Sequence, residues 1–185
     1  MIYPGRRFAQ VHISMIRRLV FCGRSMGFCE CRGSVYCVGM RNRSVPVDTV
    51  LPHITYRNLG AAIEWLGKTF GFREHFRYGE PVAGAQMHLG NAWIMAASAR
   101  PGRTSPAEAG CATQMVSVFV GDVDAHYAHT KAAGAKVVEE LHITEYGEQQ
   151  YGVEDLEGHV WIFARHARDV NPEEWGAKVA EKLEW

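Results

Sequence analysis

The chain has 185 residues, 47% of them hydrophobic, so it is long enough to bury a core as one domain or as two fused half-domains. The formal net charge is zero, but residues 1–45 contain eight arginines and a single acid, whereas the remainder has 12 basic and 19 acidic residues, a net charge of −7. An acidic body of this kind excludes nucleic-acid binding driven by charge. No apolar run approaches the ~20 residues of a membrane span, so we expect no membrane partner either.

Residues 1–45 form an Arg-rich leader that also holds four of the five cysteines, spaced C-x6-C-x-C-x5-C. This spacing fits no familiar zinc pattern and implies no disulfide framework, so a reducing, cytoplasmic compartment is expected. The basic, acid-poor composition is typical of a transit peptide. It is equally compatible with an over-long start assignment, with Met40 as the first residue, or with a basic interaction arm. We expect the leader to be disordered or a start-site artefact, outside the fold.

The first half of the body, from residue 46, shows one strand, one helix and three strands in that order. Residues 50–57 are β-branched and aromatic and predict a strand, and residues 61–70 predict an amphipathic helix that ends at Gly71. Further strands are expected at residues 73–78, 84–89 and 92–97, with Gly90-Asn91 as the turn between the last two. Residues 98–112 are rich in Pro, Gly, Ser and Ala and predict a linker.

The same order of elements then repeats. A strand is expected at residues 114–120 and a helix at 122–133, stopped by Gly134, which lies 63 residues after Gly71. Three more strands are expected at residues 136–141, 149–154 and 159–164. The pattern predicts an α+β fold of two tandem βαβββ modules, at about residues 50–97 and 113–166, within a domain of residues 46–175. A tail helix is expected over residues 172–185, with Asn171 as N-cap and Pro172 at the first helical position.

The most specific motif lies at residues 146–163, YGEQQYGVEDLEGHVWIF, in which Asp155 to Gly158 predict a hairpin turn. This stretch resembles the closing hairpin of the vicinal oxygen chelate superfamily, which includes glyoxalases, extradiol dioxygenases and bleomycin-resistance proteins; Leu156 stands where Pro is common. The segments LPHITYRNLGAAIEWLGKTFGFREH and VFVGDVDAHYAHTKAAGA resemble the two module openings of a glyoxalase-like branch. The resemblance covers nearly all of residues 50–175 and implies tandem modules that form a curved mixed sheet around a groove.

The resemblance also implies a divalent metal site with one ligand from each of four strands, which stabilises an enolate-like charge on the substrate. Carried over to this sequence, the four positions hold Leu51 or His53, Met95, Met115 and Ile162. Only His53 is a plausible ligand among them, because thioether and aliphatic side chains do not replace carboxylate or imidazole. We therefore expect no metal and no other cofactor.

What remains is an apolar, aromatic groove with few polar groups, which is typical of a small-molecule pocket but also of a plain core. The residues expected to bind a ligand are His53, Gln86, Trp93, Tyr146, Glu148, Tyr151 and Trp161. For His88 and Glu148 a solvated surface role stays open as the alternative. His126 and His129 are assigned to the exposed face of the second helix and given no role.

Three functions stay open at this point. The first is a metal-free protein that binds a small aromatic or amphipathic molecule, as bleomycin-resistance proteins do. The second is a metal-dependent enzyme, a glyoxalase-type lyase, an isomerase or a dioxygenase, with a rearranged site at His53, Gln86 and Glu148. The third is an interaction module whose groove is filled by side chains. A homodimer is expected, because related proteins complete each groove by pairing modules within or across chains.

Overall fold

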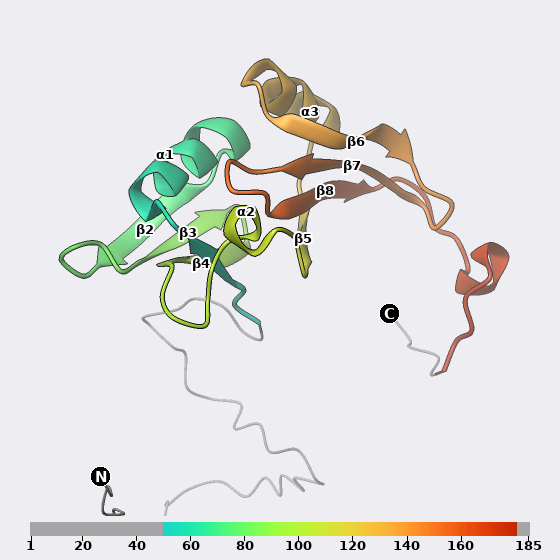
Figure 1. The fold of residues 1–185 in the computed structure, drawn as a ribbon. Helices are drawn as coiled ribbons and strands as arrows, with labels where there is room; N and C mark the ends of the chain where they lie inside the picture. The colour runs from blue at the N-terminus through green and yellow to red at the C-terminus, as the bar shows by residue number, and fades with distance from the viewer. Residues whose placement is uncertain (1–49, 181–185) are drawn as a thin grey trace, which may run out of the picture. The chain divides into compact units, whose positions relative to one another are not determined.

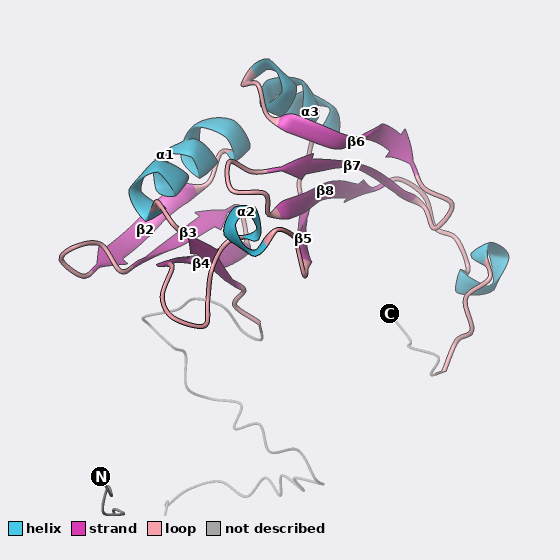
Figure 2. Cartoon of the chain, in the orientation of Figure 1, coloured by secondary structure: helices cyan, strands magenta, loops and turns pink. Residues whose placement is uncertain are grey.

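The computed structural model of the chain describes residues 50–180, which all belong to one compact unit, so the expectations for the leader lie outside the described residues (Figures 1 and 2). The first module consists of β1 (His53–Tyr56), α1 (Leu59–Phe70), β2 (Arg73–Tyr78), β3 (Gly84–Leu89) and β4 (Ala92–Ser98). The second consists of β5 (Met115–Phe119), α3 (Val123–Ala132), β6 (Lys136–Ile143), β7 (Glu148–Glu154) and β8 (Val160–His166). A one-turn helix, α2 (Pro106–Ala109), lies in the linker between them.

Each module folds into its own four-stranded mixed sheet. Sheet 1 has the strand order β1-β4-β3-β2 and sheet 2 the order β5-β8-β7-β6. In both, the first strand of the module runs parallel to the last, and the other pairs are antiparallel. Neighbouring parallel strands need a long connection, and in each module the helix and the two strands after it provide this connection between the first and the last strand. The predicted α+β architecture of two tandem βαβββ modules is confirmed.

Capping residues mark the starts of both module helices, and α1 also carries an apolar stripe. The side chain of Asn58 accepts a hydrogen bond from the Ala61 backbone N–H and caps the start of α1, and Gly71, with φ of 78°, ends it. Asp122 caps the start of α3 in the same way, through Ala125. Apolar side chains on one side of α1 are buried: Leu59, Ala62, Ile63, Leu66 and Phe70.

In each sheet one face packs against the core and the other, which we call the open face, does not. In sheet 1 the core side holds Ile54 and Tyr56, both at most 1% exposed, and the open face holds their strand neighbours. In sheet 2 the core side holds Trp161 and Phe163, both 0% exposed. The open face of sheet 1 carries His53, Thr55, Gln86, His88, Trp93 and Met95. The open face of sheet 2 carries Met115, Ser117, Phe119, Glu148, Gln150 and Ile162.

Aromatic rings from both modules meet in one core. The ring of Phe70, at the end of α1, lies edge-on to Trp161 at 5.6 Å and to Phe163 at 4.9 Å between centroids. Phe72 also lies edge-on to Trp161, again at 5.6 Å. Offset and edge-on geometries are those that aromatic pairs prefer. The strand of the predicted hairpin thus anchors the first module onto the second.

The turn of that hairpin makes one set of polar contacts between the modules. Asp155 is 6% exposed, and its carboxylate accepts hydrogen bonds from Tyr56 Oη at 2.7 Å and from Trp161 Nε1 at 3.1 Å. It also accepts the backbone N–H groups of Glu157 and His159, so that it caps its own turn as expected. Burial and the neighbouring carboxylate raise the pKa of Tyr56 well above its usual range, which keeps the phenol protonated as a donor.

A second polar contact joins the two helices, where α3 binds the last carbonyl groups of α1. His126 Nε2–H donates to Phe70 O at 3.0 Å, and His129 Nε2–H donates to Lys68 O at 2.9 Å. The Thr130 hydroxyl donates to Thr69 O. These carbonyls lack partners within α1, so the side chains of α3 satisfy them. His126 is half-buried and lies 2.7 Å from Tyr151 Oη, so it is a structural contact and not the functionless surface residue that the sequence indicated.

The environment of His126 predicts a pH-dependent stability. Burial lowers the pKa of His126, so between this lowered pKa and the ordinary value of about 6.5 the unfolded chain binds more protons than the folded chain. The stabilisation is therefore complete above about pH 6.5 and is lost as the pH falls through the lowered pKa of the folded state. Urea unfolding at pH 5 and pH 7.5 should show a smaller difference for His126→Gln than for the wild type. An equal difference would show that His126 does not contribute.

The tail forms a shorter helix than the sequence indicated. A 3₁₀ turn, η1 (Pro172–Trp175), starts with Asn171 as N-cap and Pro172 at the first position, as expected, and it ends at Gly176, with φ of 89°. The remaining described residues after it are not helical. The ring of Trp175 lies edge-on to Tyr146, 5.9 Å away, so η1 contacts the loop between β6 and β7.

Candidate functional site: the open faces of the two sheets

The strand register sets the central row of side chains on the open face of sheet 1. His53 on β1 pairs with Met95 on β4, Met95 pairs with Gln86 on β3, and Gln86 pairs with Phe76 on β2. His53 is exposed, whereas Met95 is only 8% exposed and Gln86 is fully buried. Two of the predicted ligand-binding residues, His53 and Gln86, therefore lie in one row, separated by a thioether side chain.

A β-bulge in β2 adds a residue to this face that strand alternation does not predict. The register shifts between Glu74 and Phe76, so His75 is the extra residue of the edge strand. Its Nδ1 lies 2.7 Å from Gln86 Oε1, and because an amide oxygen only accepts, Nδ1–H of His75 is the donor. Bulges often redirect a side chain next to a functional site.

Next to this pair, the open face of sheet 1 carries an aromatic and basic cluster. The imidazole of His88 stacks on Trp93 at 4.6 Å between centroids, and His75 lies edge-on to the same indole at 5.5 Å. Arg73 pairs with His88 across the two strands and so shares their face. The half-buried Trp93 is thus a flat surface beside Gln86, and its neighbours His75, His88 and Arg73 carry basic side chains.

The open face of sheet 2 is apolar at its β5 edge and carries both acidic and basic side chains further across. Met115 and Phe119 on β5 are 64% and 60% exposed. Gln150 on β7 is only 8% exposed, and it donates through Nε2 to Glu139 Oε1 at 2.9 Å. The Tyr146 hydroxyl donates to Gln150 Oε1, also at 2.9 Å, so both ends of this amide have partners.

The structure divides the predicted ligand-binding residues into two groups. His53, Gln86, Trp93 and Glu148 lie on the open faces, and Tyr146 hydrogen-bonds there to Gln150. Tyr151 and Trp161 lie on the core side of sheet 2 and are both 0% exposed. Burial raises the pKa of Tyr151 to about 12, and its hydroxyl donates to Thr130 Oγ1. We therefore leave Tyr151 and Trp161 out of the candidate site, because each packs in the core.

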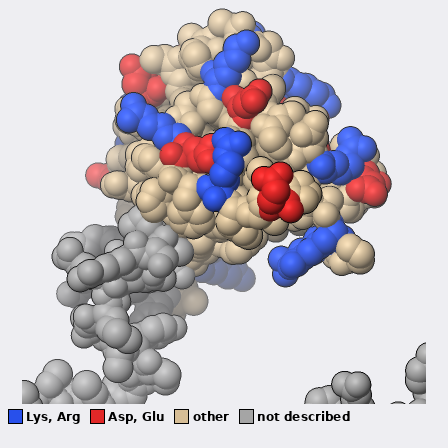
Figure 3. Space-filling view, turned by 90° about the vertical axis from the view of Figure 1, so that its left-hand side faces the viewer, with Lys and Arg blue, Asp and Glu red and all other residues tan. Residues whose placement is uncertain are grey.

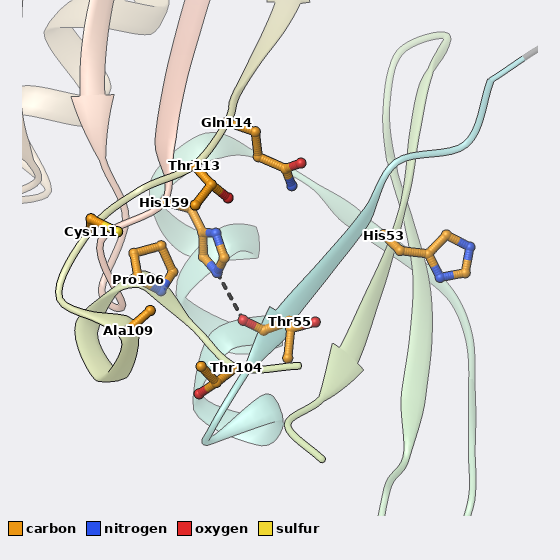
Figure 4. Close-up of a pocket in the computed structure, with 9 residues that line it drawn as sticks. All are labelled: His53, Thr55, Thr104, Pro106, Ala109, Cys111, Thr113, Gln114 and His159. Atoms are coloured by element: carbon orange, nitrogen blue, oxygen red, sulfur yellow. Dashed lines mark hydrogen bonds between the residues drawn. The ribbon is translucent and has the colours of Figure 1, made fainter. Parts of the chain in front are cut away.

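A small polar pocket of about 100 Å³ lies beside β1, against the linker (Figure 4). Its wall includes His159, whose Nε2–H donates to Thr55 O at 2.8 Å, and the linker side chains Thr113 and Gln114. His53 lies at its margin, with its ring directed away from His159. Sites for drug-sized ligands measure roughly 300–1,000 Å³, so this pocket can hold only part of such a molecule. Sequence reasoning did not predict this pocket, because polar residues are common in linkers.

The four positions that the sequence places at the usual metal site hold a donor set that does not fit a divalent ion. His53 is next to Met95 in sheet 1, and Met115 and Ile162 lie on adjacent strands of sheet 2. Within residues 50–180 there is no group of three or more His, Cys, Asp or Glu side chains arranged to hold a metal ion. Thioether and aliphatic groups do not compensate such an ion for the loss of its water.

Charge and hydropathy set two further limits. In Figure 3, basic and acidic side chains are interspersed over the visible face, unlike the continuous basic surface that nucleic-acid binding needs. Among the helices in the described part of the chain, none is long and apolar enough to cross a membrane.

Comparison with known proteins places the chain in one family. The family model "Glyoxalase/Bleomycin resistance protein/Dioxygenase superfamily" matches residues 47–163. The chain therefore belongs to this superfamily, as its hairpin and module openings indicated. No curated protein matches the sequence.

Solved structures show the same fold. The chain is similar to TioX from Micromonospora sp. ML1, at 33% identity and a TM-score of 0.54, over 65% of this chain and 99% of TioX. It is also similar to a glyoxalase/bleomycin resistance protein/dioxygenase family enzyme from Burkholderia phytofirmans PsJN, at 20% identity and a TM-score of 0.50, over 62% of this chain and 94% of that one. A related protein from Nocardioides matches at 14% identity and a TM-score of 0.51, over 76% and 92% of the two chains. The latter two share the fold alone.

Proposed function

We propose that the protein binds a small aromatic or amphipathic molecule against the open face of sheet 1, without the divalent ion usual in the superfamily. The observation that carries this proposal is the composition of that face: a flat ring pair, His88 on Trp93, lies beside a few polar groups, and the metal positions hold Met and Ile. Mostly apolar walls with a few convergent polar groups are typical of small-molecule sites.

We further propose that a second copy of the chain completes the site. Met115 and Phe119 expose more than half of their surface on the open face of sheet 2, which an isolated chain would leave in water. In the described part of the chain, the open face of sheet 1 carries Arg73, His53 and His88 and no acid, whereas that of sheet 2 carries both acids (Glu139, Glu148, Glu154) and basic side chains (Lys136, His142, His166). A two-fold dimer that places sheet 1 of one copy against sheet 2 of the other would cover the exposed Met115 and Phe119 of both copies.

Ligand binding is tested by thermal shift, because a molecule that binds only the folded state must raise its melting temperature. With an amphipathic aromatic probe such as 8-anilinonaphthalene-1-sulfonate at about 100 times its Kd, stabilisation of about 2.7 kcal/mol is expected for the wild type. Trp93→Leu should lose most of this stabilisation.

The matched control for that substitution is Trp65→Leu. Trp65, on α1, is partly buried and packs edge-on against the core residue Phe70, away from the open faces, so its loss should lower the melting temperature while the ligand-induced shift persists. Equal ligand-induced shifts in wild type and Trp93→Leu would contradict the proposed site.

The alternative function is a metal-dependent lyase, isomerase or dioxygenase with His53, Gln86 and Glu148 as ligands. The structure sets His53 and Gln86 on sheet 1 and Glu148 on sheet 2. Elemental analysis after exposure to Ni, Zn, Fe or Mn decides between the two functions. One equivalent of tightly held ion, lost in His53→Ala, would favour the enzyme.

A further inference from the structure

We propose that Gln86 determines ligand specificity, by donating a hydrogen bond from Nε2 to a carbonyl oxygen of the aromatic molecule that binds against His88 and Trp93. This inference rests on the proposed function and adds to it the chemical group that the ligand must carry. The ligand class is an aromatic ring system with a carbonyl substituent, either a carboxamide or a carboxylate.

The observation behind it is an unpaired donor. Gln86 is 0% exposed, and its Nε2 has no hydrogen-bond partner within the described residues and no contact with solvent. Leaving a buried amide N–H unpaired costs about 1–3 kcal/mol, so such atoms are rare in native proteins and each needs a reason. Both N–H groups of Gln86 Nε2 therefore lack a hydrogen-bond acceptor.

The other end of the same amide is fixed. His75 Nδ1–H donates to Gln86 Oε1, so Nε2 is directed away from His75. His75 reaches this position only because of the bulge in β2, where one extra residue interrupts the register. A bulge and a hydrogen bond that together orient an otherwise unpaired donor are the features of a prepared recognition group.

A comparison within the chain shows that burying a glutamine on an open face does not require this arrangement. Gln150 on sheet 2 is 8% exposed, and both ends of its amide are paired, with Glu139 and Tyr146. Gln150 is therefore a structural amide with every polar group paired, whereas Gln86 has an unpaired donor that a ligand can use.

The surroundings of Gln86 select the rest of the ligand. The stacked rings of His88 and Trp93 offer a flat surface for an aromatic system. Arg73 shares the face with His88, and an acid is absent from the open face of sheet 1 in residues 50–180, so an acceptor or an anion is favoured over a cation. Because Nε2 is covered in the free chain, binding must shift a covering side chain.

The binding test uses three probes of equal ring size: 2-naphthamide, 2-naphthoate and 2-methylnaphthalene. Calorimetric or fluorescence titration of the wild type should show the two carbonyl probes binding about 5- to 10-fold more tightly than the methyl probe. In Gln86→Met this preference should disappear, while the affinity for 2-methylnaphthalene persists. A carboxylate advantage over the carboxamide that vanishes in Arg73→Gln identifies an acid as the natural ligand, and its absence identifies a neutral carbonyl compound.

Stability supplies a readout that does not depend on any ligand. Gln86→Met removes the buried unpaired N–H groups of Nε2 together with the hydrogen bond from His75, whose exposed ring can donate to water instead, so the melting temperature of the free protein should stay unchanged or rise. Gln150→Met removes a fully paired amide and leaves Glu139 and Tyr146 without their partner, so it should lower the melting temperature. An equal fall in melting temperature for Gln86→Met and Gln150→Met would show that Nε2 of Gln86 has a partner, and this result would refute the inference.

The possible failures are distinguishable. If the three probes bind equally, or if Gln86→Met keeps the carbonyl preference, the role of Gln86 is refuted while the proposed aromatic site stands. If none of the probes binds, the proposed function itself is refuted, and the inference with it. Side-chain amide NMR of Gln86 gives a direct check, because an Nε2 proton that donates to a carbonyl must shift on addition of 2-naphthamide and not on addition of 2-methylnaphthalene.

Discussion

Replacing Asp155 with alanine is expected to lower the free energy of unfolding by about 3–5 kcal/mol, which corresponds to a melting temperature about 10–20 °C lower. The carboxylate accepts four hydrogen bonds while only 6% exposed, and its removal leaves the Tyr56 hydroxyl and the Trp161 N–H buried without an acceptor. Each unpaired buried donor costs about 1–3 kcal/mol. The hydrogen bond from Tyr56 to Asp155 also joins the two modules, so its loss should destabilise both modules.

The control is Asp122→Ala. Asp122 is an exposed carboxylate that accepts one backbone N–H at the start of α3, so its loss should cost only about 1 kcal/mol. Asp155→Asn keeps one acceptor oxygen and should fall between the two. Urea unfolding followed by both far-UV and near-UV circular dichroism measures the three variants and shows whether the transition remains two-state. Equal losses for Asp155→Ala and Asp122→Ala would show that the hairpin turn does not hold the modules together.

The tandem modules could be predicted because their signals are local. Gly71 and Gly134 stop equivalent helices, and both have a positive φ, which other residues rarely adopt. Asp155 and Gly158 define the hairpin turn in the same way, by side-chain capping and by a positive φ. Such features depend on a few neighbouring residues, so they can be recognised without knowing what packs where.

The parts of the site that could not be predicted depend on register between strands. Alternation places Trp161 and Ile162 on opposite faces but does not say which face meets the groove; the hydrogen bond from Trp161 to Asp155 decides it. Alternation also fails at His75, because the bulge in β2 arises from how that strand fits β3. His126 binds a carbonyl group at the end of α1, and the pattern of apolar residues in the sequence does not predict such a contact.

The second large effect concerns assembly: Phe119→Glu combined with Met115→Glu is expected to convert a dimer into a monomer. Both side chains lie on the open face of sheet 2 and are at least 60% exposed in the single chain, so the fold should tolerate the substitutions. In the proposed dimer they would be buried against a second copy, where an unpaired carboxylate is strongly disfavoured. The wild type should sediment as a dimer at micromolar concentration, and the double variant as a folded monomer.

Leu156→Glu provides the matched control, because Leu156 is also an exposed apolar residue, at 40%, but lies in the hairpin turn and not on an open face. It should leave the sedimentation coefficient of the dimer unchanged. A wild type that sediments as a monomer at micromolar concentration would contradict the proposed dimer. A double variant that still sediments as a dimer would show that the interface does not include Met115 and Phe119. If the site needs both copies, the double variant should also lose the thermal shift with 8-anilinonaphthalene-1-sulfonate, whereas Leu156→Glu keeps it. Loss of dimer without loss of that shift would confine the ligand to sheet 1 of a single chain.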